Sequence, residues 1–277
     1  MKIYFNYFRP LSLAIIVLSL LSSCKDEVED LFGGDEEEEE TELKVQIASN
    51  GEFGDILVDQ DNQSLYFFAG DVSGESNCNG GCAGVWPALA GEAYELELGS
   101  GLSNGDFSAI TREDGQKQIA FKGWPLYYFS PEADGVLEAP GDTQGDGRGG
   151  VFHIAKPDYS VLLGQQSVVE GEDPVVYLVD EFGVSLYRSI NDGENVSNCA
   201  GGCAEVWPPF EAPEELIIPS SLSPDDFDSF YREDDLGPQL TFQGSPLYFF
   251  TPDEGKRGSV LGQGGAGETF FVVEPTL

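Results

Sequence analysis

The chain has 277 residues, with 50 acidic and 13 basic side chains and a formal net charge of −37. This balance excludes nucleic acid as a ligand, because binding to phosphates depends on clustered Lys and Arg side chains. It favours cations or a basic protein surface as partners. The 35 glycines and the 12% aromatic content predict short strands separated by many turns.

The N-terminus has the pattern of a secretory signal peptide. Lys2 and Arg9 precede an apolar run over residues 11–21, and this run is shorter than the roughly 20 apolar residues of a membrane-spanning helix. Small residues and then Cys24 follow, which resembles a bacterial lipobox. We therefore expect residues 1–23 to be removed and Cys24 to be lipidated. The alternative is an ordinary secretory signal with an incidental cysteine.

Residues 24–44 are predicted to form a lipidated acidic tether. Lys25, Asp26 and Glu27 are similar to the export signal that sends Bacteroidota lipoproteins to the outer face of the outer membrane. Residues 25–42 hold eleven acidic side chains and one basic side chain, and such a charge block repels itself and stays extended. The predicted location is therefore the outer membrane, with the protein facing the cell exterior.

The rest of the chain is a tandem duplication whose two halves align at a shift of 121 residues. We predict one domain over residues 45–160 and a second over residues 165–277, joined where residues 164–167 interrupt the pattern. The longest shared segment is Cys-x-Gly-Gly-Cys-Ala-x-x-Trp-Pro, which begins at Cys78 and again at Cys199. An agreement of this length indicates a duplicated domain.

A fainter repeat lies inside each half, where a Leu-Tyr pair returns at spacings of 61, 60 and 61 residues. Gly or Pro turns between β-favouring runs indicate hairpins, and no long segment after the signal keeps a helical period. We therefore expect an all-β fold of two tandem homologous small β domains. Each would have two hairpins plus a closing strand, with short helical pieces after the Cys motifs.

A four-bladed propeller is the alternative architecture. It is disfavoured because each unit has too few strands to fill a blade. Two separate domains should yield two stable fragments after proteolysis between residues 159 and 173.

The residues resemble a family of secreted-repeat bacterial lipoproteins of unknown function, whose signature is Tyr-x-aromatic-x-x-Asp. Two copies fit fully, one substitutes Glu132 for the Asp, and one lacks the third-position aromatic. The Cys-x-Gly-Gly-Cys segment also matches. The resemblance covers residues 50–275 and implies an extracytoplasmic protein without an established activity. The motif residues are Tyr66, Phe68, Asp71, Tyr127, Phe129, Tyr187, Asp192, Tyr248, Phe250 and Asp253.

Four cysteines beyond Cys24 are grouped two and two. In an exported protein such grouping predicts disulfides. Each half has its own pair, which favours local bridges over bridges between the halves. The alternative is thiol redox chemistry, although the Cys-x-x-Cys motif of thioredoxin-type enzymes is absent. The four residues are Cys78, Cys82, Cys199 and Cys203.

The sequence indicates no cofactor. His153, aligned with Val272, is the only histidine, so copper and haem sites lack their usual ligands. Residues 142–147 carry spaced Asp and Gly, so calcium binding by this loop is an alternative. A Gly-rich turn without a ligand is favoured. Trp86 and Trp207 are expected to pack on the disulfides, and stacking on a ring ligand is the alternative.

No nucleophile–base set, phosphate-binding loop or zinc pattern emerges, so we expect no enzymatic activity. The sequence predicts a surface-exposed lipoprotein that acts as a non-catalytic binding or accessory module of a cell-envelope complex. Its partners would be the membrane, through the lipid, and another envelope or surface protein. The alternative function is envelope thiol redox or electron transfer through the Cys-x-Gly-Gly-Cys motifs.

Overall fold

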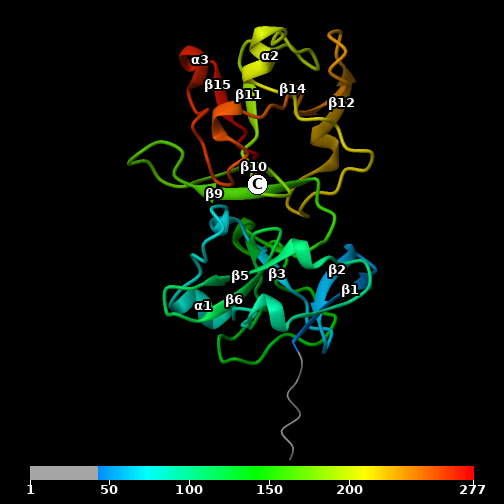
Figure 1. Cartoon of the computed structure of the whole chain (residues 1–277), viewed down its shortest axis with the longest axis vertical. Coiled ribbons are helices and arrows are strands. Elements are labelled where there is room, and N and C mark those ends of the chain that lie inside the picture. Colours follow the sequence, from blue (N-terminus) through cyan, green and yellow to red (C-terminus); the bar gives the residue numbers. More distant parts are fainter. Residues whose placement is uncertain (1–42) are drawn as a thin grey trace, which may run out of the picture. The chain divides into compact units, whose positions relative to one another are not determined.

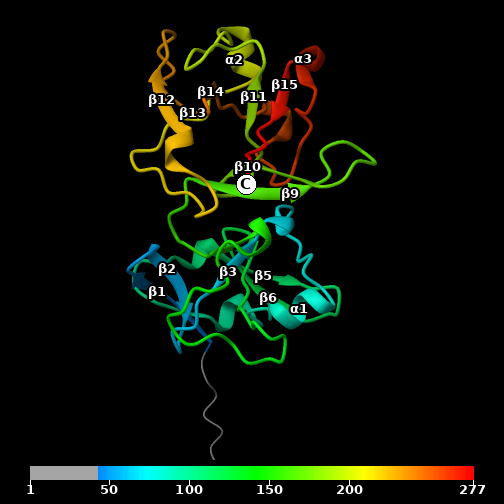
Figure 2. The same ribbon diagram turned by 180° about the vertical axis from the view of Figure 1, so that it is seen from behind.

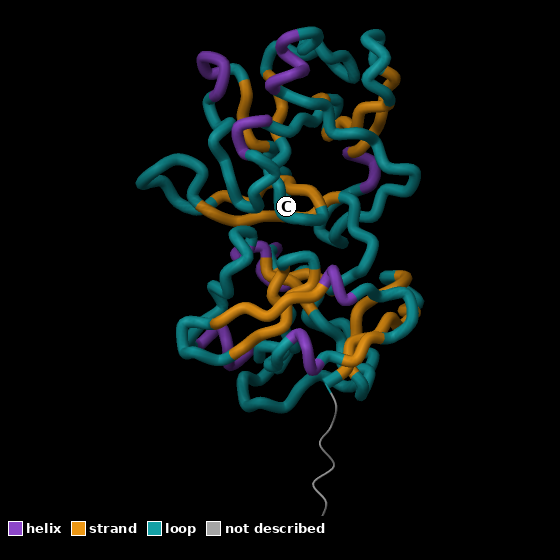
Figure 3. The backbone as a smooth tube through the Cα atoms, in the orientation of Figure 1, coloured by secondary structure: helices purple, strands orange, loops and turns teal. Residues whose placement is uncertain are grey.

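Short strands joined by long loops make up the described part of the chain (Figure 3). The computed structural model describes residues 43–277. The signal peptide, Cys24, the export signal and nearly all of the acidic tether therefore lie outside the described residues. The strands of the described part form small sheets of two or three strands, in agreement with the all-β prediction. Within residues 43–277, no helix is both long enough and apolar enough to span a membrane.

The two halves of the chain contain closely similar elements in the same order (Figures 1 and 2). The first half comprises β1 (Lys44–Asn50), β2 (Gly54–Asp59), β3 (Tyr66–Phe68), α1 (Gly81–Val85), β4 (Glu97–Leu98), β5 (Phe107–Thr111), β6 (Lys117–Phe121), β7 (Trp124–Pro125) and β8 (Phe152–Ile154). The second half comprises β9 (Val161–Gln166), β10 (Val175–Asp180), β11 (Tyr187–Ser189), α2 (Gly202–Val206), β12 (Phe227–Tyr231), β13 (Pro238–Phe242), β14 (Ser245–Pro246), α3 (Gly265–Glu268) and β15 (Phe270–Val272).

Strand pairing follows one scheme in both halves. An antiparallel hairpin opens each half, β1 with β2 and β9 with β10. A three-stranded meander follows, β5-β6-β7 or β12-β13-β14. The closing strand returns to the strand that carries the first motif tyrosine, β8 to β3 and β15 to β11. The duplication seen in the sequence is therefore a duplication of topology.

Aspartate side chains shape the turns that lead into β3 and β11. Asp59 Oδ1 accepts hydrogen bonds from the backbone N–H groups of Asp61 at 2.8 Å and Gln63 at 2.9 Å. Asp180 binds two backbone N–H groups in the same way. An Asp side chain that bonds to the backbone ahead of it stabilises a tight turn, so both halves deliver the motif tyrosine from the same kind of turn.

Two details differ from the sequence-based expectation. Residues 164–166 form the end of β9 rather than an interruption, so the second half begins at Val161 and not at residue 165. The first expected hairpin would join the runs 56–58 and 65–68 across the turn at residues 59–64. Instead, β2 pairs with β1, and β3 pairs with the closing strand β8. The sequence can indicate that a short apolar run forms a β-strand. Which strand it pairs with depends on which other apolar run packs on the same core.

The two halves contact each other, and residues 43–277 lie within one compact unit. Arg257 donates to the carbonyl oxygens of Val72 at 2.9 Å and Lys122 at 3.1 Å, and its guanidinium lies 4.7 Å from the centre of a Trp124 ring. Burial lowers the pKa of Arg257 to about 10. Lys122 also forms an ion pair with Glu181.

We predict that limited proteolysis cuts the exposed loop 167–174 without releasing two free fragments. The strands β9 and β10 flank this loop and pair over six residues, so the cut ends stay joined by their hydrogen bonds. The nicked protein should give two bands on a denaturing gel and one species of native size in gel filtration. Separate elution of the fragments in native buffer would contradict this prediction.

Candidate functional site

The motif tyrosines lie at the centre of each half and are joined through their backbones. Tyr187 and Tyr248 exchange both backbone hydrogen bonds, each at 2.9 Å. Tyr66 and Tyr127 make the same exchange at 2.8 and 3.0 Å. All four side chains are fully buried. The pairing brings together motif copies that are distant in the sequence.

In the second half, each buried tyrosine hydroxyl donates to the acid of the other motif copy. Tyr187 donates to Asp253 at 2.6 Å, and Tyr248 donates to Asp192 at 2.6 Å. A hydrogen bond to a charged acceptor is roughly twice as strong as one between neutral groups. The Tyr-x-aromatic-x-x-Asp motif is therefore a reciprocal lock, in which each copy supplies one donor and one acceptor.

The first half keeps one of these bonds and rebuilds the other. Tyr127 donates to Asp71 at 2.5 Å, as the reciprocal lock requires. The acid of the second motif copy is Glu132, which is exposed, and Tyr66 donates instead to the buried Glu138. Sequence reasoning missed Glu138 because the motif fixes the acid by spacing, whereas the hydroxyl requires only a carboxylate within reach.

Burial raises the pKa values of the four motif tyrosines and of Asp71, Glu138 and Asp192. Desolvation raises the pKa of Asp71 to about 7, although the hydrogen bonds from Tyr127 and the Asn77 N–H oppose the shift. Burial also raises the pKa values of Glu138 and Asp192. The tyrosine pKa values are raised by burial together with the neighbouring carboxylates, so each hydroxyl keeps its proton and remains the donor.

The two repeated tryptophans complete these aromatic clusters. Trp86 stacks on Phe152 and Trp207 stacks on Phe270, each with ring centres 3.8 Å apart. Only 4% of Trp86 and 3% of Trp207 is exposed. The alternative role of stacking on a ligand is therefore wrong for both, because the closing-strand phenylalanine occupies the ring face that a ligand would use.

Both predicted local disulfides are present, Cys78–Cys82 and Cys199–Cys203. Gly80 and Gly201 adopt φ values of 58° and 56°, a conformation that glycine adopts readily, and so allow the chain to close the short loop. One cysteine of each bridge is buried, which restricts access by an attacking thiolate. The position of the bridges favours a structural role.

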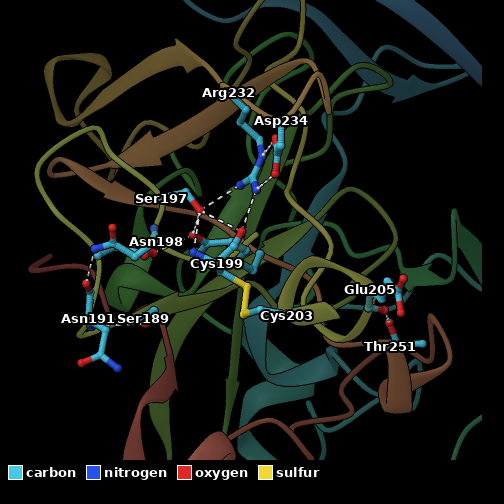
Figure 4. Close-up of a disulfide and its surroundings, with 12 residues drawn as sticks. Ser189, Asn191, Ser197, Asn198, Cys199, Cys203, Glu205, Arg232, Asp234 and Thr251 are labelled. Carbon is cyan, nitrogen blue, oxygen red and sulfur yellow. Dashed lines mark hydrogen bonds and ion pairs between the residues drawn. A yellow bond between two sulfur atoms is a disulfide. The ribbon is translucent and has the colours of Figure 1, made fainter. Parts of the chain in front are cut away.

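A buried arginine holds each disulfide loop, and Figure 4 shows the loop of the second half. Arg232 donates to the Cys199 carbonyl oxygen at 2.6 Å, to Ser197 Oγ at 2.9 Å and to Gln239 Oε1 at 2.6 Å. It also donates to both carboxylate oxygens of Asp234, at 2.8 and 2.5 Å. These bonds use all five N–H groups of the guanidinium. Arg112 makes the equivalent bonds to the Cys78 carbonyl oxygen, Ser76 and Gln118.

Beside the second disulfide, the loop before Cys199 and the β12–β13 hairpin enclose a depression of about 400 Å³. This volume is within the range of small-molecule sites. A smaller cavity of about 200 Å³ includes Cys199 and Cys203 in its lining. The depression is lined by Asn195, Val196, Ser197, Asn198, Ala200, Phe230, Tyr231, Arg232, Glu233 and Asp234.

His153 is a buried strand residue, as expected, but its counterpart is not Val272. Strand pairing places His153 opposite Phe67 and Phe271 opposite Arg188, so Phe271 occupies the equivalent position. Neither ring nitrogen of His153 has a hydrogen-bond partner among the described residues. Burial lowers the pKa of His153 to about 4, against the opposing effect of nearby Asp146.

The loop over residues 142–147 uses its carboxylates for contacts within the protein. Asp146 accepts hydrogen bonds from the Ile154 N–H at 2.7 Å and from the Ser220 hydroxyl. Asp142 accepts one from the Gln144 side chain at 2.7 Å. Across residues 43–277, no group of three or more His, Cys, Asp or Glu residues is arranged to hold a metal ion.

We predict that Gly262→Ala weakens the second half. A Cβ atom at Gly262 would lie 2.7 Å from the Tyr187 ring and 3.0 Å from Trp207, so the Tyr187 lock must shift. The free energy of unfolding, measured by urea titration, should fall by about 1–3 kcal/mol. Gly202→Ala is the control, because its Cβ would meet nothing within 4 Å. Equal losses in both variants would contradict the prediction.

We predict that His153→Phe removes part of the acid sensitivity of the fold. The folded-state pKa of about 4 lies below the ordinary value of 6.5. The unfolded chain therefore binds more protons between pH 4 and 6.5, and the wild type loses stability as the pH falls through this window. Relative to the variant, the loss should reach about 3 kcal/mol. Urea titrations at both ends of the window measure it, and a pH-independent difference would contradict it.

Residues 48–90 and 108–156 match a family described as a secreted repeat of unknown function. Each matched segment contains one tyrosine motif, so the fainter repeat inside a half corresponds to the family unit. No curated protein and no solved structure matches the chain. The family, the topology and the two disulfides agree with an extracellular or envelope protein. The chain therefore contains two copies of this secreted repeat of unknown function, within residues 48–156.

Proposed function

We propose that the protein is a non-catalytic binding or accessory module, displayed on a lipid anchor, that docks onto another envelope or surface protein. One observation carries this proposal. The residues repeated in both halves are used in contacts inside the fold: tyrosines bind acids, arginines hold disulfide loops and tryptophans stack on phenylalanines. What the duplication preserves is therefore a rigid frame, which suits display of a surface.

The second half offers such a surface beside its disulfide. Val196 and Tyr231 line the depression and are 52% and 83% exposed. Exposed apolar side chains around a depression are typical of interaction sites. The net charge of −37 favours a basic partner surface by electrostatic attraction.

The N-terminal segment supports display outside the cell. The apolar run over residues 11–21 is followed by Cys24, and the acidic tether separates this cysteine from the first strand. Several acyl chains on one cysteine give stable attachment where a single chain binds only marginally. With Lys25, Asp26 and Glu27 as the export signal, the protein would stand on the outer face of a Bacteroidota-like outer membrane.

We predict that the full-length lipoprotein, crosslinked in intact cells and solubilised in mild detergent, is recovered with a specific envelope or surface protein. The control is a chain truncated after residue 44, which keeps the anchor and tether but lacks both halves. The partner should be lost with the truncation, because we assign binding to the folded part. Recovery of only a free monomer in several mild detergents, or of the same partner with the tether alone, would refute the proposal.

We predict that Cys24→Ala releases the protein from membranes into the soluble fraction. Neutral replacements of Lys25, Asp26 and Glu27 should instead leave the protein lipidated but move it to the periplasmic face. Protease shaving of intact cells separates the two outcomes, since only an outward-facing chain is cut. If the neutral variant is shaved as readily as the parent, the tripeptide is not the export signal.

A further inference from the structure

The depression beside Cys199 combines a frame common to both halves with side chains found only in the second. Its shared part is identical in the two halves. Its other lining residues differ: the second half has two aromatic side chains where the first has Ile and Thr, an amide where the first has glycine, valine where the first has an acid, and alanine where the first has an amide. The shared residues are Ser197, Asn198, Arg232, Glu233 and Asp234, equivalent to Ser76, Asn77, Arg112, Glu113 and Asp114; the changed ones are Asn195, Val196, Ala200, Phe230 and Tyr231, equivalent to Gly74, Glu75, Asn79, Ile110 and Thr111.

The second half therefore adds an aromatic wall to a fixed frame. Tyr231 ends β12, where its backbone pairs with Pro238, and its side chain is 83% exposed. Asn198 is the donor in both of its hydrogen bonds to the loop. Its backbone N–H donates to Asp192 at 2.7 Å, and its side-chain nitrogen donates to the Asn191 carbonyl oxygen at 2.6 Å. The side-chain oxygen of Asn198 remains available as an acceptor.

The charges that line the depression fit neither an anion-binding site nor a strongly cation-selective site. Arg232 occupies both carboxylate oxygens of Asp234, so the two form a neutral pair in the lining. Within residues 43–277, the Glu233 carboxylate has no hydrogen-bond or ion-pair partner. The lining thus offers one unpaired carboxylate, side-chain amides and an open tyrosine ring, and its only cation is already paired.

We propose that this depression is a binding site for a neutral saccharide. The C–H face of a sugar ring packs on an exposed aromatic face, while its hydroxyl groups bind amides and a carboxylate that can accept several hydrogen bonds. The volume of about 400 Å³ suits one or two sugar rings. This inference names a ligand for the proposed binding role. It rests on the proposed function only in taking the protein to bind without catalysing a reaction. The protein partner of the tethered module is a separate question.

The test uses the full-length protein in a detergent without a sugar headgroup. Saturation-transfer NMR would probe neutral trisaccharides built from glucose, mannose or N-acetylglucosamine. At least one should bind with a dissociation constant of about 1 mM or lower. Tyr231→Thr, which installs the residue of the first half, should weaken binding about tenfold or more. The matched control is Tyr94→Thr, because Tyr94 is 81% exposed in the first half and lies outside the depression.

Three results would overturn the proposal: no saturation transfer to any trisaccharide at about 10 mM, equal weakening by Tyr231→Thr and Tyr94→Thr, or binding of an oligo-arginine peptide alone that is lost in Glu233→Gln. The last result would assign the site to a basic protein segment. Crosslinking of the Tyr231→Thr protein separates the two ideas, because a retained protein partner with lost sugar binding leaves the docking role intact.

Discussion

The fold depends on the exchange between paired tyrosines in each half. Tyr187 and Tyr248 share two backbone hydrogen bonds, and each sends its hydroxyl to the carboxylate of the other motif copy. A buried hydroxyl without a partner would cost about 1–3 kcal/mol. In the second half, neither motif copy can therefore be buried satisfactorily without the other.

The same requirement explains the glycine and the tryptophan near each lock. Gly262 leaves room for the Tyr187 ring, and Trp207 packs against both. Gly145, Tyr66 and Trp86 repeat the arrangement in the first half. The disulfide and its arginine fix the loop that precedes this tryptophan, so the covalent bridge and the polar contacts stabilise one continuous structure.

The duplication preserved this frame and let the surface diverge. Arg232 and Arg112 hold their disulfide loops by the same set of bonds, although the side chains beside them differ. Residues that face solvent on a rigid scaffold can change at little cost to stability. The difference between Tyr231 and Thr111 therefore changes the surface of the second half rather than its fold.

The sequence alone determined the features that local chemistry decides. Alternating apolar runs and Gly or Pro turns give β structure, and paired cysteines in an exported chain give local bridges. The tandem halves were visible as identical spacing, and the motif carries the resemblance to the secreted-repeat family. Each of these features depends on residues close together in the chain.

Only the tertiary structure decided which distant residues meet. Glu138 replaces the motif acid beside Tyr66 because the folded loop brings its carboxylate there, and no spacing rule contains that information. The strand registers placed Phe271, not Val272, at the position of His153, since loops of different length shift a sequence alignment. The faces of Trp86 and Trp207 are likewise covered by strands far along the chain. Contacts of this kind are set by the shape of the shared core, which is a property of the whole chain.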